Sequence, residues 1–500
     1  MRVLYYNWVD YLDDEARGGG VSVYLKNLMT ALDAQPDTQA VFLSSGISYD
    51  LRHGSPRWEQ MRHGSDEDRH RRYEIVNSGV LSPAHHAFGN PAQLSHPATR
   101  DVFFDFVEKT GPYDVIHFNN LEGIPADVLE IKARWPGIRV VLSLHNYYPI
   151  CPQVNLWYQE KVACTDFKAG SKCGDCLVHK HDERLVRMAN AVAYRLKCAG
   201  VRPGTRVFDQ LFRQSMRLGS RGARGAGWLR RKLWEGGKKQ IGHTDIAAEF
   251  AERRPGMIRQ INAGCDLVLC VSDRVRAIAQ DYGVDPDLLR TSYIGTREAV
   301  KFETTKPKVR LKDEEKTLTL AYMGYMRRDK GFFFLLDALE ALPRDLAARL
   351  RVVVAARAGE PEAMTRLELL KLRLARLIHL DGYSHDGLDD LLRDVDVGLV
   401  PVLWEDNLPQ VAIEMHARHI PLLTSNMGGA QELAGCGDMV FDAGNTADFG
   451  DRIRALLEGE VDMQDYWDKA NAPQTMPGHL DELNRLYCGE ITPLSPPTAP

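Results

Sequence analysis

Two parts of the chain alternate short apolar runs with amphipathic segments, the pattern of strands and helices in an α/β domain. In the first part, this pattern predicts a helix over Val21–Leu32 and strands over Arg2–Trp8, Ala40–Leu43, Val115–Phe118, Val140–Leu144 and Asp266–Val271. In the second part, it predicts a helix from Phe332 and strands over Leu318–Met323, Arg351–Ala355 and Leu377–Leu380. We therefore expect two α/β domains.

The stretch from Asp394 to Glu432 is the most informative about function. Its apolar run Val395–Val402 predicts a buried strand, Pro409 favours the start of a helix of about ten residues, and Ile420–Leu423 begins a second strand. A strand–helix–strand unit of this kind has parallel strands and a right-handed crossover. The loops that carry Asp406 and Gly428–Gly429 then lie at the carboxyl edge of the sheet, where α/β proteins bind ligands.

An acidic residue stands within the apolar helix of this unit. Val411, Ala412, Ile413, Met415 and Ala417 leave little room for a polar face, yet Glu414 lies among them. A buried carboxylate is costly unless another group pairs with it. Asp406 lies eight residues earlier. One interpretation is an acid near a helix N-terminus and a glutamate that reaches solvent. The other is a pair of carboxylates that face one polyhydroxylated ligand.

Three further patterns at strand ends are candidate binding sites. Arg327, Arg328 and Lys330 lie in the turn Gly324–Gly331 between a strand and a helix, where they form a candidate diphosphate clamp. The alternative is ordinary surface charge. Gly18, Gly19 and Gly20 precede a helix, where glycines let a backbone approach an anion or simply form a flexible turn. A lone histidine is more often structural than catalytic, but His145 follows directly after a predicted strand, a position that favours contact with a ligand.

Size and composition are those of a globular protein with two or three domains. The chain has 500 residues, of which 44% are hydrophobic and 26% charged, and its net charge of −5 gives no overall nucleic-acid signature. No apolar run reaches the length of a membrane span, and the first residues lack a signal-peptide core. Nine cysteines then favour a reducing cytoplasm. We expect residues 489–500, which are rich in proline, to be disordered.

Four cysteines cluster in residues 151–176. Only the last two have the close spacing typical of zinc knuckles, but the set Cys151, Cys164, Cys173 and Cys176 is compatible with a structural zinc site. The alternative is free thiols in a loop. A catalytic metal is not indicated, because no ligand set with an open position is visible.

Residues 183–242 form a strongly basic insertion. Between Arg184 and Lys239 there are fifteen Lys or Arg residues and two acids, interleaved with Trp228 and Trp234. Basic residues with tryptophan favour an anionic membrane surface or a phosphate-bearing acceptor as partner. The alternative is a solvated basic loop. Nucleic acid is the least favoured partner, because the remainder of the chain is acidic.

These motifs together resemble glycosyltransferase family 4, a family of retaining enzymes with the GT-B fold. The resemblance covers residues 1–180 and 244–488, and its most specific parts are the Asp406–Glu414 step, the Gly428–Gly429 loop and the turn Gly324–Gly331. It implies two Rossmann-like domains that face each other across a cleft, with the basic, largely helical insertion in the first. The expected bounds are 1–300 for the acceptor-side domain, 301–316 for a linker, 317–460 for the nucleotide-sugar domain and 461–488 for helices that pack back on the first domain.

The resemblance also implies roles for single residues. Glu414 binds the ribose hydroxyls of a nucleotide sugar, and Asp406 binds the donor sugar. Lys330, with Arg327 or Arg328, binds the diphosphate, and His145 lies beside the donor sugar. The other expected binding residues are Gly18, Gly19, Gly20, Gly324, Tyr383 beside the base, Asn407, Leu408, Gln410, Gly428 and Gly429.

Two positions depart from the family pattern. An arginine usually follows the glycine that matches Gly324, and Tyr325 stands there in this chain. Ile294-Gly-Thr296 replaces a common Asn-Gly pair. The first departure removes a cation that stabilises the leaving diphosphate, so Arg327 or Arg328 must supply that charge if the chain is an enzyme.

The expected function is a retaining transfer of a sugar from a nucleoside diphosphate sugar to a glycan or lipid-linked acceptor, in bacterial cell-surface polysaccharide synthesis. Cationic side chains take the charge-neutralising role, so no cofactor is expected beyond the structural zinc. The alternatives are a nucleotide-sugar 2-epimerase and a non-catalytic sugar-nucleotide-binding protein. We expect the protein in the cytoplasm, with peripheral contact of residues 184–239 with the inner face of the membrane and no nucleic-acid partner.

Overall fold

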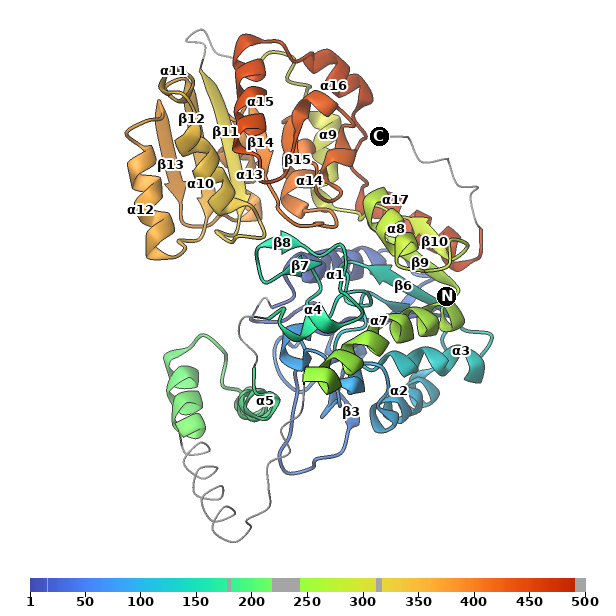
Figure 1. The fold of residues 1–500 in the computed structure, drawn as a ribbon. Coiled ribbons are helices and arrows are strands. Elements are labelled where there is room, and N and C mark those ends of the chain that lie inside the picture. Colours follow the sequence, from blue (N-terminus) through green and yellow to red (C-terminus); the bar gives the residue numbers. More distant parts are fainter. Residues whose placement is uncertain (16, 178–180, 218–242, 312–316, 491–500) are drawn as a thin grey trace. The chain divides into compact units, whose positions relative to one another are not determined.

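The computed structural model describes residues 1–15, 17–177, 181–217, 243–311 and 317–490. They divide into two compact units (Figure 1). Unit 1 comprises Met1–Val154, Thr165–Leu269 and Ala279–Arg290, and unit 2 comprises Asn155–Cys164, Cys270–Ile278 and the chain from Thr291 onward. Each unit is built around one large β-sheet with helices packed on it, which confirms the predicted α/β fold class. None of the helices in the described part of the chain is both long and apolar enough to cross a membrane.

The sheet of unit 1 has the strand order β10-β9-β6-β5-β1-β2-β4-β3. β1 pairs in parallel with β2 and β5, and the edge strand β3 is antiparallel to β4. Its centre is fully buried, because Val3 to Tyr6 of β1 have no exposed surface. The strands are β1 (Arg2–Tyr6), β2 (Gln39–Ser45), β3 (Arg57–Gln60), β4 (Arg72–Val76), β5 (Val115–Phe118), β6 (Arg139–Leu144), β9 (Leu267–Cys270) and β10 (Leu289–Thr291).

Helices connect these strands as the amphipathic segments predict. Ser272 accepts a hydrogen bond from the N–H of Val275 (3.2 Å), so it caps the helix after β9 as its sequence position indicates. The helices associated with this sheet are α1 (Gly19–Leu32), α2 (Pro97–Thr110), α3 (Ile131–Arg134), α4 (Ser171–Gly174), α5 (Glu183–Cys198) and α7 (His243–Gly264). The helix α8 (Asp273–Asp281) is divided, because residues 273–278 belong to unit 2 and residues 279–281 to unit 1.

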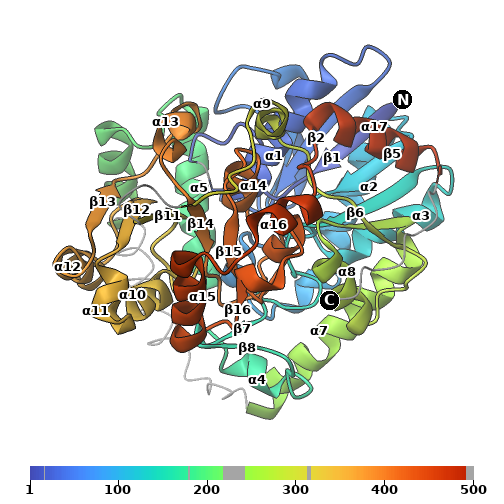
Figure 2. The ribbon, with the colours of Figure 1, turned by 90° about the horizontal axis from the view of Figure 1, so that it is seen from above.

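The sheet of unit 2 is doubly wound, with the order β13-β12-β11-β14-β15-β16. Figure 2 shows α10, α12 and α15 on one face of this sheet and α13 and α14 on the other. The strands are β11 (Leu318–Gly324), β12 (Leu350–Ala356), β13 (Arg376–Leu380), β14 (Val397–Val400), β15 (Leu422–Ser425) and β16 (Val440–Phe441), and β7 (Trp157–Tyr158) and β8 (Val162–Ala163) form a separate hairpin.

The helices of unit 2 bury a continuous apolar core against the strands. Aromatic and aliphatic side chains of α10, α12, α15 and α16 pack there with those of β11 and β12. The helices are α9 (Lys301–Thr304), α10 (Phe332–Ala341), α11 (Arg344–Ala347), α12 (Pro361–Leu370), α13 (Leu388–Leu392), α14 (Gln410–His416), α15 (Thr446–Glu458), α16 (Met463–Lys469) and α17 (Met476–Tyr487).

Several predicted boundaries need correction. The helix after Pro409 is seven residues long, because the chain turns into the left-handed region at His419 (φ 54°). The strand that follows is Leu422–Ser425. β14 and β15 are parallel, as the strand–helix–strand pattern requires. Residues 301–304 of the predicted linker are helical. The helices α16 and α17 are grouped with unit 2, and their packing on the first domain stays a prediction. In unit 2, the hydroxyl of Tyr466 accepts the N–H of Leu422 (2.9 Å).

The first part of the basic insertion is an ordered element of unit 1. Arg187 of α5 donates hydrogen bonds to the carbonyls of Ser78 (2.9 Å) and Gly79 (2.8 Å), and its guanidinium lies 5.0 Å from the ring centre of Tyr49. Arg195 pairs with Asp50 at 3.1 Å. Two of the basic residues therefore hold α5 in place. Trp228 and Trp234, on which the membrane prediction depends, lie outside the described residues.

We expect Arg187→Ala to loosen α5. Two hydrogen bonds from a charged group are lost at a half-buried site, which costs about 1–2 kcal/mol. Hydrogen exchange of the α5 amides, followed by mass spectrometry, measures this loss directly. Arg184→Ala is the matched control, because Arg184 is exposed on the same helix. Equal exchange in the two variants would contradict the anchoring role.

Candidate functional site

The candidate site in unit 2 lies at the carboxyl edge of its sheet, where the loops after β11, β14 and β15 meet. Gly428 has a φ of 72°, and a Cβ atom on it would stand 2.1 Å from the carbonyl oxygen of Asp406. The N–H of Gly429 donates to that same oxygen (2.9 Å). The predicted Gly428–Gly429 loop thus packs directly on the backbone of Asp406, and only glycine permits this approach at Gly428.

Lys330 and Asp406 meet in this structure. The Nζ of Lys330 lies 2.5 Å from the Oδ2 of Asp406, and 5.2 Å from the ring centre of Trp404. Asp406 is buried and Lys330 is half-buried. The turn that carries Lys330 is held tightly, because a Cβ atom on Gly331 would meet the carbonyl oxygen of Pro401 at 1.6 Å. Lys330 and Asp406, 76 residues apart in sequence, therefore form one charged pair at the strand ends.

The two arginines of the same turn make other contacts. Arg327 pairs with Asp329 through two hydrogen bonds, of 2.9 and 2.8 Å. Arg328 is exposed and lies over the ring of Phe333, 4.7 Å from its centre. Tyr325, at the position of the usual arginine, is 57% exposed. A ligand that uses Arg327 as its diphosphate contact has to compete with Asp329.

Glu414 is buried in α14 and is paired on one side. Its Oε1 lies 3.1 Å from the Nε2 of His385, while its Oε2 is buried with no hydrogen-bond partner among the described residues. The carboxylate is 4% exposed. A buried carboxylate oxygen without a partner is costly, and the hydroxyl groups of a ligand can satisfy it.

Tyr383 and His385 lie beside this glutamate. Burial, and next the charge of Glu414, raise the pKa of Tyr383. The hydrogen bond to Glu414 raises the pKa of His385, against the effect of partial burial. The ring centres of Tyr383 and His385 are 6.4 Å apart. Tyr383 is 36% exposed, so its ring combines a buried part with an accessible one, as a base-binding side chain requires.

Two further carboxylates of unit 2 hold these loops in place through hydrogen bonds. Glu405 accepts hydrogen bonds from the N–H of Gly428 (3.0 Å) and from the Nε of Arg274 (2.9 Å). Glu432 accepts from the N–H groups of Asp273 (2.8 Å) and Arg274 (2.7 Å), at the N-terminus of α8. Burial raises the pKa of Glu432.

Sequence reasoning did not assign roles to Arg274, Glu405 or Glu432. Two sequence positions could have indicated such roles: Glu405 is next to Asp406, and Glu432 ends the Gly-Gly-Ala-Gln-Glu motif. The N–H groups of Gly428 and Gly429 both donate to protein acceptors here, so a phosphate has to take over those hydrogen bonds or meet another part of this loop.

The three remaining predicted residues of this loop lie at the start of α14. Asn407 and Leu408 are buried and Gln410 is half-buried. Pro409 is the N-cap and has no N–H to donate. Gly324 ends β11 with a φ of 135°, a backbone conformation that favours glycine.

In unit 1, the carboxyl ends of β1, β5 and β6 gather a polar cluster around His145. The Nε2 of His145 lies 3.3 Å from the Oδ1 of Asn119, and its ring lies 5.1 Å from that of Tyr24 on α1. Asn120 donates to the side chain of Asn7 at the same edge. Since His145 follows β6 directly, its predicted place at a strand end is confirmed.

The glycine triplet forms the start of α1 rather than a free loop. Gly19 and Gly20 are the first two residues of the helix and are exposed, and Gly19 has a φ of 55°. A Cβ atom on Gly18 would stand 1.9 Å from the Oγ of Ser22, so this position has no room for a side chain.

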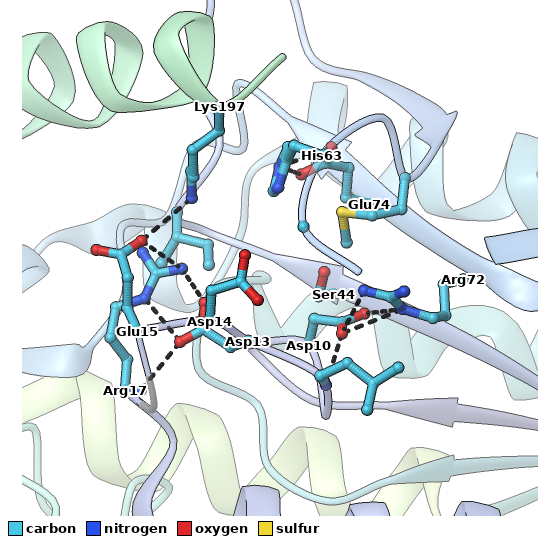
Figure 3. A pocket seen from close by; sticks show the side chains of 14 residues that line it. Asp10, Asp13, Asp14, Glu15, Arg17, Ser44, His63, Arg72, Glu74 and Lys197 are labelled. Atoms are coloured by element: carbon cyan, nitrogen blue, oxygen red, sulfur yellow. Dashed lines mark hydrogen bonds and ion pairs between the residues drawn. The ribbon is translucent and has the colours of Figure 1, made fainter. Parts of the chain in front are cut away.

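Unit 1 also contains a small charged cavity of about 20 Å³ (Figure 3). Asp10 pairs with the buried Arg72 through hydrogen bonds of 2.9 to 3.2 Å, and Asp13 pairs with Arg17. Lys197 of α5 reaches Glu15 at 3.3 Å. Five carboxylates and three Arg or Lys side chains line the cavity, so its lining carries an excess of negative charge. It has room for about one water molecule. This network ties the acidic stretch after β1 to the end of α5.

The four cysteines of the predicted zinc site are divided between the units. Cys164 belongs to unit 2, and Cys151, Cys173 and Cys176 belong to unit 1. The Sγ of Cys176 lies 2.9 Å from the Oε1 of Gln153. Arg253 and Arg254 of α7 donate to the carbonyls of Tyr148 and Ile150 (both 2.8 Å), which holds the start of this segment without a metal. The zinc site stays a prediction.

Comparison with known proteins agrees with this geometry. Residues 302–473 match the family model described as glycosyl transferases group 1, and this range contains Lys330, Asp406 and Glu414. No match was found among curated proteins.

Solved GT-B glycosyltransferases share the fold at low identity. Anabaena HepE in complex with UDP is 13% identical, with a TM-score of 0.53, and the alignment covers 98% of this chain and 100% of that one. Sucrose-phosphate synthase from Thermosynechococcus elongatus is 12% identical (TM-score 0.54; 98% of each chain). A trehalose-phosphate synthase from Burkholderia xenovorans in complex with glucose-6-phosphate is 13% identical (TM-score 0.52; 98% and 100%). The fold is therefore GT-B.

The pair of Glu414 and His385 predicts a pH-dependent contribution to stability. Because the folded-state pKa of His385 is raised, this contribution is complete below the ordinary histidine pKa of about 6.5 and is lost as the pH rises through the folded-state pKa. His385 is 38% exposed, so we expect less than about 1 kcal/mol. The difference in unfolding free energy between wild type and His385→Gln should therefore shrink from pH 6 to pH 9.

The control for this prediction is the same substitution in a Glu414→Gln background. Without the carboxylate, the effect of His385→Gln should no longer vary with pH over this range. A pH dependence that persists in that background would show that Glu414 is not the cause.

Proposed function

We propose that the protein is a retaining glycosyltransferase that moves a sugar from a nucleoside diphosphate sugar to a glycan or lipid-linked acceptor. The observation that carries this proposal is the buried, half-satisfied carboxylate of Glu414, which lies in the same region as the Lys330–Asp406 pair, within the range that matches group 1 glycosyltransferases. The complex of the structural neighbour HepE with UDP-glucose supports a donor of this kind.

Each residue has a physical role in this proposal. The Oε2 of Glu414 accepts a hydrogen bond from a ribose hydroxyl, which satisfies an oxygen that has no protein partner. Tyr383 lies beside the base. Asp406 binds hydroxyls of the donor sugar, and Lys330 moves from Asp406 to the diphosphate when the donor binds.

Catalysis in this scheme consists mainly of stabilising the leaving group. Cleavage of the sugar–phosphate bond builds negative charge on the diphosphate and positive charge on the sugar ring. Lys330, the N-terminus of α10 and an arginine of the turn stabilise the diphosphate. Arg328 suits this role better than Arg327, because Arg328 has no carboxylate partner among the described ion pairs while Arg327 is bound to Asp329.

We expect Lys330→Ala and Glu414→Gln each to lower sugar transfer by about 10²–10³-fold or more, because each removes one contact to the donor. The readout is transfer from a radiolabelled donor, with thermal unfolding as the test of folding. Lys371→Ala is the matched control. Lys371 directly follows α12, is exposed and pairs with Glu368. Transfer at the wild-type rate in either site variant would refute the assignment.

Donor identity can be tested separately. UDP-, GDP- and ADP-sugars at about 100 times their dissociation constant add about 2.7 kcal/mol of stability when they bind, so a thermal-shift panel identifies the base. Glu414→Gln should abolish the shift for the matching donor. A non-catalytic binding protein, which Tyr325 favours as the second candidate, would show the same shift without donor hydrolysis or transfer. A 2-epimerase would convert the donor without an acceptor.

A lipid-linked acceptor predicts a separate role for residues 218–242, which carry seven of the fifteen basic residues and both tryptophans. Their deletion should spare donor hydrolysis, because α5 and the sheet remain intact. It should reduce co-sedimentation with vesicles that contain anionic lipid and slow transfer to an acceptor in those vesicles. Unchanged activity on the vesicle-bound acceptor would contradict the membrane role.

A further inference from the structure

Three histidines outside the proposed donor site converge on the surface of unit 1. His85 and His86 lie on the 3₁₀ helix Ala84–Ala87, and His181 lies two residues before α5. One ring nitrogen from each lies within 4.8 Å of the other two. In the part of the chain that the structure describes, this is the only such convergence of three or more His, Cys, Asp or Glu side chains.

The two segments that carry these histidines are held together by other contacts. The side-chain amide of Asn90 donates to both carboxylate oxygens of Glu183, at 2.9 and 3.0 Å. Arg187, one turn further along α5, is bound to the carbonyls of Ser78 and Gly79. These hydrogen bonds hold the two segments next to each other, so the three histidines are close together before any ion binds.

The geometry of the rings suits metal ligation. The ring centres are 4.3 Å apart for His85 and His86, 4.9 Å for His86 and His181, and 5.6 Å for His85 and His181. A tetrahedral ion with metal–nitrogen bonds of about 2.0–2.1 Å needs nitrogen atoms about 3.4 Å apart. Because His85 and His181 are exposed, small rotations of their side chains are enough to reach that spacing.

His86 has the environment of a metal ligand. Its Nδ1 lies 3.4 Å from the carbonyl oxygen of Ser82, which favours a proton on Nδ1. The unprotonated Nε2 is then the atom that can bind a metal ion.

We propose that His85, His86 and His181 form a binding site for a divalent transition-metal cation, with Zn²⁺ as the ion that best fits three imidazoles. Imidazole nitrogen ligands suit Zn²⁺, Cu²⁺ and Ni²⁺, and three protein ligands leave a fourth position open to water. The bound ion links the 3₁₀ helix to the start of α5, and so adds a metal cross-link to the element that begins the basic insertion. This site is separate from the four cysteines and independent of the transferase proposal.

The experiment is a Zn²⁺ titration of the chelator-treated full-length protein against a chromophoric zinc chelator. It is performed in a Cys173→Ser/Cys176→Ser background, which removes the closely spaced cysteine pair of the predicted zinc site. We expect one Zn²⁺ per chain at micromolar or lower concentration. His181→Asn should weaken binding by at least about tenfold, and His85→Asn/His181→Asn should abolish it. Both residues are exposed, so these variants keep the fold.

His53→Asn is the matched control, because His53 is also exposed, at 76%, and lies outside the cluster. It should bind Zn²⁺ as the background protein does. Hydrogen exchange gives a second readout: Zn²⁺ should slow exchange in the first turn of α5 in the control and not in the His85→Asn/His181→Asn variant. Equal zinc affinity in that variant and in the control, or binding at millimolar Zn²⁺ only, would overturn the proposal.

Discussion

The architecture of the candidate site depends on one close approach between two backbones. Gly428 lies against the peptide of Asp406 at a distance that leaves no space for a Cβ atom, and the N–H of Gly429 donates to the carbonyl of Asp406. This contact joins the loop after β14 to the loop after β15, and so fixes the place from which the Asp406 carboxylate meets Lys330. The glycine pair thus positions the acid, and the acid in turn holds the lysine of a third loop.

The charged side chains of this region form pairs of opposite sign. Arg274 pairs with Glu405, Lys330 with Asp406 and Arg327 with Asp329, and Glu414 lies within ion-pair distance of His385. Neighbouring opposite charges lower the cost of keeping so many ionisable groups at one sheet edge. They also mean that any anionic ligand bound by Lys330 or Arg327 would have to replace an existing ion pair.

The fold, and the positions of the candidate site residues at strand ends, could be predicted from sequence because the signals are local. Short apolar runs indicated β11, β14 and β15. Lys330, Asp406 and Glu414 lie within a few residues of glycines or of Pro409 in the sequence, which marked them as part of strand-end loops or of the helix that follows. What escaped prediction depends on contacts over long sequence separations. His385 reaches Glu414 from 29 residues away, and His181 joins His85 from 96 residues away. β3 was missed because its four residues are partly exposed and lack an apolar run.

Glu432 acts as an internal anion at the end of a helix. Its carboxylate accepts hydrogen bonds from the N-terminal amides of α8, so the protein itself fills a position that could otherwise hold a phosphate group. Loss of this carboxylate would leave these amides open to an anion from solution. Glu432 therefore keeps this helix end closed.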